Sequence, residues 1–161
     1  MDSVAAVVKS KIDMLLGEKD FVIVAIDGKC TSGKTTLASK LAELYDCNVF
    51  HMDDFFLPLE LRTPERFAQP GGNVHWERVL AEVLQPLAVG KTPEYGVFDC
   101  SVMAVNRTAR VEAKDVVIVE GAYSLHPALR DFYDLKVFLS VEEEPQKARI
   151  LARNGEQMLQ R

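Results

Sequence analysis

The sequence predicts an α/β fold in which a parallel β-sheet is flanked by helices, and two patterns support this prediction. Short apolar segments rich in β-branched residues recur along the chain, and amphipathic segments with helical spacing separate them. The apolar segments are continuous rather than alternating, as is typical of strands buried on both faces of a parallel sheet. The predicted strands are residues 21–26, 48–52, 116–119 and 135–139.

The segments between these strands carry helix and turn signals. Helices are predicted over residues 3–16 and 36–45, from a cap at Asn73 through Leu87, over a short stretch that starts at Pro127, and from about residue 145 to the end. The Pro- and Gly-rich residues 58–72 are expected to form mainly loop. Residues 95–111 favour a hairpin, which we place at a sheet edge.

The size and charge of the chain narrow its class. A length of 161 residues predicts one domain, and a net charge of −5 argues against general affinity for nucleic acids or anionic membranes. Cys30, Cys47 and Cys100 are too irregularly spaced for a disulfide framework or a zinc site, and free thiols indicate a reducing compartment. No segment has the apolar length of a signal peptide core or a membrane span, so we predict a cytoplasmic protein.

Residues 28–35 form a complete GxxxxGK(S/T) motif between a predicted strand and a predicted helix. The glycines let successive backbone N–H groups point at phosphate oxygens, and the helix adds the positive end of its dipole. Lys34 can reach the β- and γ-phosphates, and the Thr35 hydroxyl can bind Mg²⁺. The alternative is a chance match, expected on the order of once in a hundred chains of this length. The predicted nucleotide-binding residues are Gly28, Lys29, Cys30, Thr31, Ser32, Gly33, Lys34, Thr35 and Thr36.

Acidic residues follow two of the predicted strands. Glu120 ends the third strand, at the edge where ligands of open α/β sheets bind, and it can hold Mg²⁺ directly or through water. Asp53 and Asp54 end the second strand, where a carboxylate can orient a substrate hydroxyl and accept its proton. The alternatives are a polar residue where a strand leaves the core and a pair of acids that starts a loop.

Basic and imidazole side chains offer weaker signals. Arg149 and Arg153 share one face of the last predicted helix and can neutralise phosphate charge, or can instead be solvated partners of the acidic residues 142–144. His51 and His126 have no obvious partners in the sequence, and we expect structural or surface positions for both.

Four segments of the chain together resemble the uridine kinase-like family of P-loop kinases, which includes nicotinamide riboside kinases. They are HMDDFFLP, PGGNVHWERVLAEVLQPLAVGKTPEY, VEGAYSLHPALRDFYDLKVFL and RILARNG. The resemblance implies a P-loop NTPase fold with a substrate-side loop and hairpin insertion. It also implies that Asp53 is the catalytic base, that Glu120 stands at the Mg²⁺ position, and that Tyr95 contacts the substrate base. Arg149 and Arg153 would then be lid residues that touch the phosphates.

The chain departs from the family pattern at the acceptor side. His75 stands where related nucleoside kinases carry an aspartate for the ribose hydroxyls, and Cys100 lies near the position of a base-contacting histidine. The chain also stops within the expected lid helix, so it looks truncated or unusually short beside the family.

These observations predict an enzyme that uses ATP and Mg²⁺ to phosphorylate a hydroxyl of a nucleoside-like molecule. The alternatives are a kinase for another small alcohol, such as a sugar, pantothenate or nicotinamide riboside, and a nucleotide-binding protein without catalysis. A GTPase switch is disfavoured because no NKxD segment is present. The expected partners are ATP and the alcohol rather than nucleic acid or membrane, and the sequence leaves homo-oligomer formation open.

Overall fold

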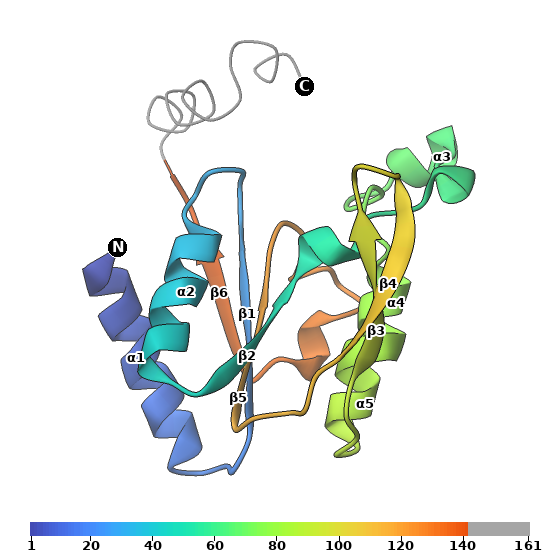
Figure 1. Cartoon of the computed structure of the whole chain (residues 1–161). Helices are drawn as coiled ribbons and strands as arrows, with labels where there is room; N and C mark the ends of the chain where they lie inside the picture. The colour runs from blue at the N-terminus through green and yellow to red at the C-terminus, as the bar shows by residue number, and fades with distance from the viewer. Residues whose placement is uncertain (142–161) are drawn as a thin grey trace.

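Four parallel strands form the central sheet of the protein. The computed structural model describes residues 1–141 and places β1 (Val22–Gly28), β2 (Cys47–His51), β5 (Val116–Glu120) and β6 (Leu135–Leu139) in the order β2-β5-β1-β6. Every neighbouring pair in this sheet is parallel (Figure 1). The four predicted strands and the parallel α/β architecture are therefore confirmed.

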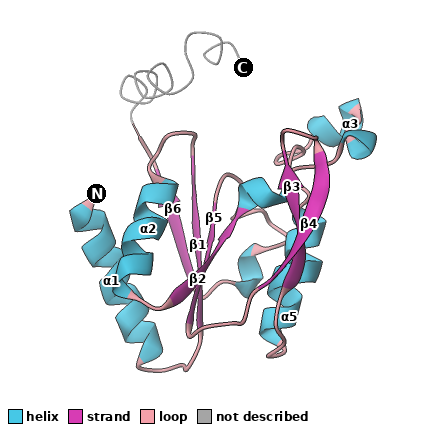
Figure 2. Cartoon of the chain, in the orientation of Figure 1, coloured by secondary structure: helices cyan, strands magenta, loops and turns pink. Residues whose placement is uncertain are grey.

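The central strands of the sheet are buried because helices and loops cover both faces (Figure 2). All residues of β1 and β5 are buried, and alternate residues of each strand face two separate cores. One core packs against α1 (Asp2–Leu16) and α2 (Lys34–Leu44), which match the predicted helices. The other core packs against a helix over residues 76–88 and against the hairpin that follows it. β1 and β5 thus have the two-sided burial that their sequences predict, whereas Lys136 and Phe138 of the edge strand β6 are exposed.

The helix over residues 76–88 begins later than we predicted. It comprises α4 (Trp76–Arg78), the π-helical segment η3 (Val79–Leu84) and α5 (Gln85–Ala88), and His75 rather than Asn73 is its cap. The residues before it form a turn that pairs with the loop that follows β2. The Asn73 carbonyl accepts the Leu57 N–H, and the His75 N–H donates to the Phe55 carbonyl. These contacts hold Asn73 outside the helix.

The segment between β2 and this helix consists of loops and short turns, as its Pro and Gly content predicts. It contains η1 (Met52–Phe55), η2 (Leu59–Leu61) and α3 (Pro64–Phe67). The Thr63 hydroxyl caps α3 by accepting the Arg66 N–H at 3.1 Å. The acidic pair predicted at the end of the second strand therefore lies in η1, just beyond that strand.

Two further expectations about local structure are wrong. The hairpin of β3 (Glu94–Asp99) and β4 (Ala104–Arg110) is a separate two-stranded sheet, not an edge of the central one. The Arg78 and Glu82 side chains bind the backbone of Gly96, so the hairpin packs against the helix instead of pairing with β2. The segment after Pro127 forms turns and the short η4 (Arg130–Phe132) rather than an α-helix.

Two predictions remain, the C-terminal helix and the lack of a membrane span, and the first concerns residues outside the described chain. The helix predicted from about residue 145 lies beyond residues 1–141. Within those residues, no helix combines the length and hydropathy that a membrane span requires.

Candidate active site

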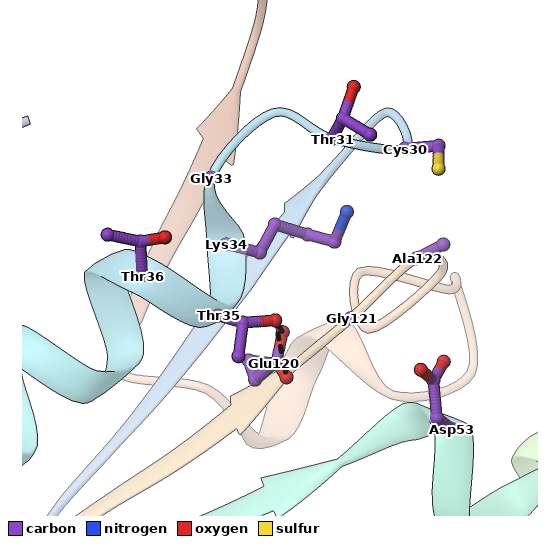
Figure 3. A pocket seen from close by; sticks show the side chains of 10 residues that line it. All are labelled: Cys30, Thr31, Gly33, Lys34, Thr35, Thr36, Asp53, Glu120, Gly121 and Ala122. Atoms are coloured by element: carbon purple, nitrogen blue, oxygen red, sulfur yellow. Dashed lines mark hydrogen bonds between the residues drawn. The ribbon is translucent and has the colours of Figure 1, made fainter. Parts of the chain in front are cut away.

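The carboxyl ends of β1, β2 and β5 meet around a cavity of about 390 Å³. The phosphate loop and the start of α2 form one wall, and the ends of β2 and β5 form the other (Figure 3). This is the edge of a parallel sheet at which open α/β folds bind ligands. The lining residues are Cys30, Thr31, Gly33, Lys34, Thr35, Thr36, Asp53, Glu120, Gly121 and Ala122.

The phosphate loop folds tightly between β1 and α2. Gly28 has φ 152°, and a Cβ built there would lie 2.3 Å from the Leu139 carbonyl oxygen, so glycine is required. The Lys34 ammonium group donates to the carbonyls of Gly28 and Lys29, both at 2.9 Å, and points into the cavity (Figure 3). Gly28, Lys29 and Ser32 belong to the same loop but are not among the residues that line the cavity. The loop therefore presents one ammonium group beside the N-terminus of an eleven-residue helix.

Glu120 connects the phosphate loop to the neighbouring strand β2. Glu120 is 5% exposed. Its carboxylate accepts the Thr35 hydroxyl at 3.3 and 3.4 Å, and its Oε1 lies 2.6 Å from Nδ1 of His51. The hydrogen bond that the His51 ring donates to this carboxylate raises the pKa of His51. From the sequence we expected His51 to be a structural or surface residue, and this contact with Glu120 was not predicted. The available signal was its position, because His51 ends a strand that neighbours the strand ending in Glu120.

The two acids of η1 have different surroundings. Asp53 is exposed, and its carboxylate points into the cavity across from the phosphate loop (Figure 3). Asp54 is half-buried, and burial raises its pKa, while the charges of His51 and Arg107 act in the opposite direction. Only Asp53 of this pair lines the cavity. The structure therefore separates two neighbours that the sequence treats almost equally.

Comparisons with known proteins identify the family of this chain. No family model matches it. The uridine kinase of Macrococcus caseolyticus is 30% identical over 145 residues, which are 84% of this chain and 69% of that protein. The chain belongs to the uridine kinase-like family. The uridine kinase of Ligilactobacillus salivarius is 28% identical over 146 residues, covering 84% of this chain and 68% of the relative.

A solved structure supports the fold of this family member. It is described as a possible uridine kinase from Bacillus stearothermophilus and superposes with a TM-score of 0.66 at 22% identity, covering 96% of both chains. The predicted family, the P-loop fold and the assignment as an ATP-dependent kinase are thereby confirmed.

Two of the residues expected to contact the acceptor, Tyr95 and His75, are not among the residues that line the cavity. Tyr95 is 7% exposed, and its ring packs against Phe50 and Phe55 at centroid distances of 5.4 and 5.3 Å. Burial raises the pKa of Tyr95. Tyr95 is therefore buried and does not line the cavity, and its contact with a substrate base remains a prediction.

His75, the residue that caps α4, is half-buried. Burial lowers its pKa, and its Nδ1 is buried without a hydrogen-bond partner among residues 1–141. The charged neighbours that act on the pKa of His75 are Glu77, Arg78, Arg66 and Glu82. Arg149 and Arg153, the expected lid residues, lie outside the described residues.

Oxygen ligands suitable for a hard cation lie next to each other at the base of the cavity. The Thr35 hydroxyl and the Glu120 carboxylate are in contact, and hydroxyl and carboxylate oxygens are the donors that Mg²⁺ prefers. Within residues 1–141 there is no cluster of three or more His, Cys, Asp or Glu residues that could hold a metal. Such a sparse donor set fits an ion that keeps several waters and binds substrate phosphates.

Proposed function

We propose that this kinase transfers the γ-phosphate of ATP to a hydroxyl group of a nucleoside-like small molecule. The observation that carries this proposal is the placement of Asp53 across one cavity from the phosphate loop. A kinase of this kind has to bring the acceptor hydroxyl and the γ-phosphate together and has to exclude water. A cavity shared by Asp53 and the phosphate loop would bring the two reacting groups together.

The nucleotide side of the cavity is built to neutralise phosphate charge. Backbone N–H groups of the loop and the N-terminus of α2 would bind phosphate oxygens. Lys34 would exchange its contacts with the carbonyls of Gly28 and Lys29 for charge-assisted contacts with the β- and γ-phosphates. Thr35 and Glu120 would hold Mg²⁺, which supplies further positive charge against the transferring group.

The acceptor side requires a base near the attacking oxygen. Asp53 would accept the proton of the substrate hydroxyl as the oxygen forms its bond to the γ-phosphorus and the bridging bond to ADP breaks. Asp54 is less suited because it is half-buried and does not line the cavity. Arg149 and Arg153 remain proposed phosphate contacts of this transition state.

The identity of the acceptor is a separate part of the proposal. The relatives are named uridine kinases, which favours a nucleoside. Two features favour another small alcohol. His75 replaces the expected ribose-binding aspartate, and neutral imidazole offers one acceptor nitrogen where a carboxylate accepts both hydroxyls. Tyr95 is buried in the core. A sugar or pantothenate is therefore the second candidate, whereas nicotinamide riboside carries the same ribose hydroxyls as other nucleosides and is not favoured by these two features.

The proposal is tested by incubating the full-length protein with Mg-ATP and a panel of nucleosides and small alcohols. Mass spectrometry should detect one acceptor with an added phosphoryl group, and GTP in place of ATP would reveal the donor preference. Asp53→Asn is the matched control, because it should bind Mg-ATP and form far less product in the same time. If Mg-ATP binds but no acceptor in the panel is phosphorylated, the chain is a nucleotide-binding protein without this activity.

A further inference from the structure

Asp27 is a buried acid that the proposed chemistry does not use. It lies in β1 directly before the phosphate loop and is 8% exposed within an otherwise apolar strand. Its Oδ1 accepts the backbone N–H groups of Gly28 at 2.6 Å and Tyr123 at 3.1 Å, and its Oδ2 accepts that of Leu125 at 2.9 Å. No ion pair within residues 1–141 includes Asp27, so the carboxylate is held there by backbone donors.

The segment that Asp27 holds is also a wall of the cavity. Residues 121–125 follow β5, and Gly121 and Ala122 line the cavity opposite Lys34 (Figure 3). Gly121 has φ 136°, and a Cβ there would lie 2.6 Å from the Met52 Cβ. Tyr123 has φ 65°, which non-glycine residues adopt at an energetic cost, so this conformation has to be imposed by its surroundings.

We propose that Asp27 is a positioning residue for the nucleotide site, and that its carboxylate fixes the phosphate loop and residues 121–125 relative to each other. This role rests on the proposed function. The chemistry of the three contacts favours a carboxylate over its isostere. A carboxylate accepts hydrogen bonds at both oxygens, whereas asparagine would place an NH₂ group against the N–H of either Leu125 or the Gly28 and Tyr123 pair. One wall of the cavity would then move relative to the other.

The first test is Asp27→Asn, with the dissociation constant for Mg-ATP measured by calorimetry and the melting temperature measured in parallel. We expect affinity to fall about tenfold or more, equivalent to roughly 1.4 kcal/mol. Asp134→Asn is the matched control. Asp134 also accepts a backbone N–H of β1, from Ile23 at 2.9 Å, but at the opposite end of the strand. This control should lower the melting temperature and leave Mg-ATP affinity unchanged.

A rescue variant separates positioning from general stability. Glycine adopts φ 65° without strain, so Tyr123→Gly in the Asp27→Asn background should recover part of the lost affinity. If Asp27→Asn does not fold, amide hydrogen exchange in the unmodified protein can measure how firmly Asp27 holds residues 121–125. The amides of Tyr123 and Leu125 should be protected, and Mg-ATP should slow their exchange further.

Three results would overturn this role. They are an affinity of Asp27→Asn within twofold of the unmodified protein, an equal loss in Asp134→Asn, and exchange at Tyr123 and Leu125 that is unprotected or ignores nucleotide. Failure of the unmodified protein to bind Mg-ATP is a distinct result. It would remove the proposed function itself, and this role with it.

Discussion

Lys34 is the one cation among the described residues that line the cavity, and its ammonium group rests on two carbonyl oxygens. Exchanging those neutral contacts for phosphate oxygens should contribute roughly 1.5–3 kcal/mol to nucleotide binding. We therefore expect Lys34→Ala to weaken Mg-ATP binding about 10- to 100-fold in calorimetry and to abolish turnover. Lys40→Ala, on the same helix but paired with Asp2, is the control and should bind normally. Normal binding by Lys34→Ala would remove the phosphate-loop assignment.

The two acids of η1 should differ in function because only one of them lines the cavity. Asp53→Asn should leave Mg-ATP binding nearly intact and lower turnover by roughly 100-fold or more, the scale of a lost general base. Asp54→Asn should have a milder effect. Steady-state kinetics with an identified acceptor, together with nucleotide calorimetry, measure both. A larger loss of turnover in Asp54→Asn would show that the base has been assigned to the wrong acid.

At the scale of elements, aromatic stacking joins the loop after β5 to the helix that covers the sheet. The His126 ring stacks on Trp76 with centroids 4.8 Å apart and an interplanar angle of 14°. Arg66 lies 5.8 Å from the Trp76 ring centroid and binds Glu77 through two nitrogens, at 2.6 and 2.8 Å. His126 was expected to be a structural or surface residue. It has a structural role, because its ring links the loop after β5 to α4.

This stack should make stability depend on pH. Burial lowers the pKa of His126 below its ordinary value of 6.5, so the unfolded chain binds the proton more readily than the folded one. Its contribution to stability is therefore fully present above pH 6.5 and is lost as the pH falls below that value. Urea unfolding can be followed through Trp76, the single tryptophan, and should show this acid loss.

The control for this prediction is His126→Gln. It should reduce the loss of stability on acidification without abolishing it, because burial lowers the pKa of His75 in the same direction. The prediction fails if the variant and the unmodified protein lose stability equally between about pH 7.5 and about pH 5.

At the scale of the whole molecule, nucleotide binding should stabilise the fold, because the phosphate loop, β2 and β5 meet at the cavity. Ligand at about 100 times its dissociation constant adds about 2.7 kcal/mol to the free energy of unfolding. For a chain of this size that corresponds to a rise in melting temperature of about 5–10 °C. Differential scanning fluorimetry with Mg-ATP measures this rise.

Metal removal tests the same prediction. With EDTA present, the rise produced by ATP should shrink, because Thr35 and Glu120 would then face the phosphates without the cation. The metal assignment fails if ATP with EDTA stabilises the protein as strongly as Mg-ATP does. If Mg-ATP at saturating concentration gives no rise, the nucleotide site itself is in doubt.

The sequence by itself determined the features that depend on local patterns. The strands around β1 and β5 follow from continuous apolar runs, because a run of buried residues specifies burial on both faces wherever it lies. The phosphate loop follows from the spacing of Gly28, Gly33 and Lys34, because eight consecutive residues carry the whole conformation. The parallel arrangement predicts that Glu120 and the phosphate loop lie at the same edge of the sheet, and the contact with Thr35 follows because β5 lies beside β1.

Only the tertiary structure decided which distant residues meet. His51 contacts Glu120 across 69 residues of sequence, and Asp27 accepts the N–H of Tyr123 across 96. These partners are set by the order of strands in the sheet and by the turns that follow them, which no local pattern specifies. Packing likewise buried the ring of Tyr95 against Phe50 and Phe55 and kept the hairpin out of the central sheet, because neighbouring elements compete for the same apolar surface.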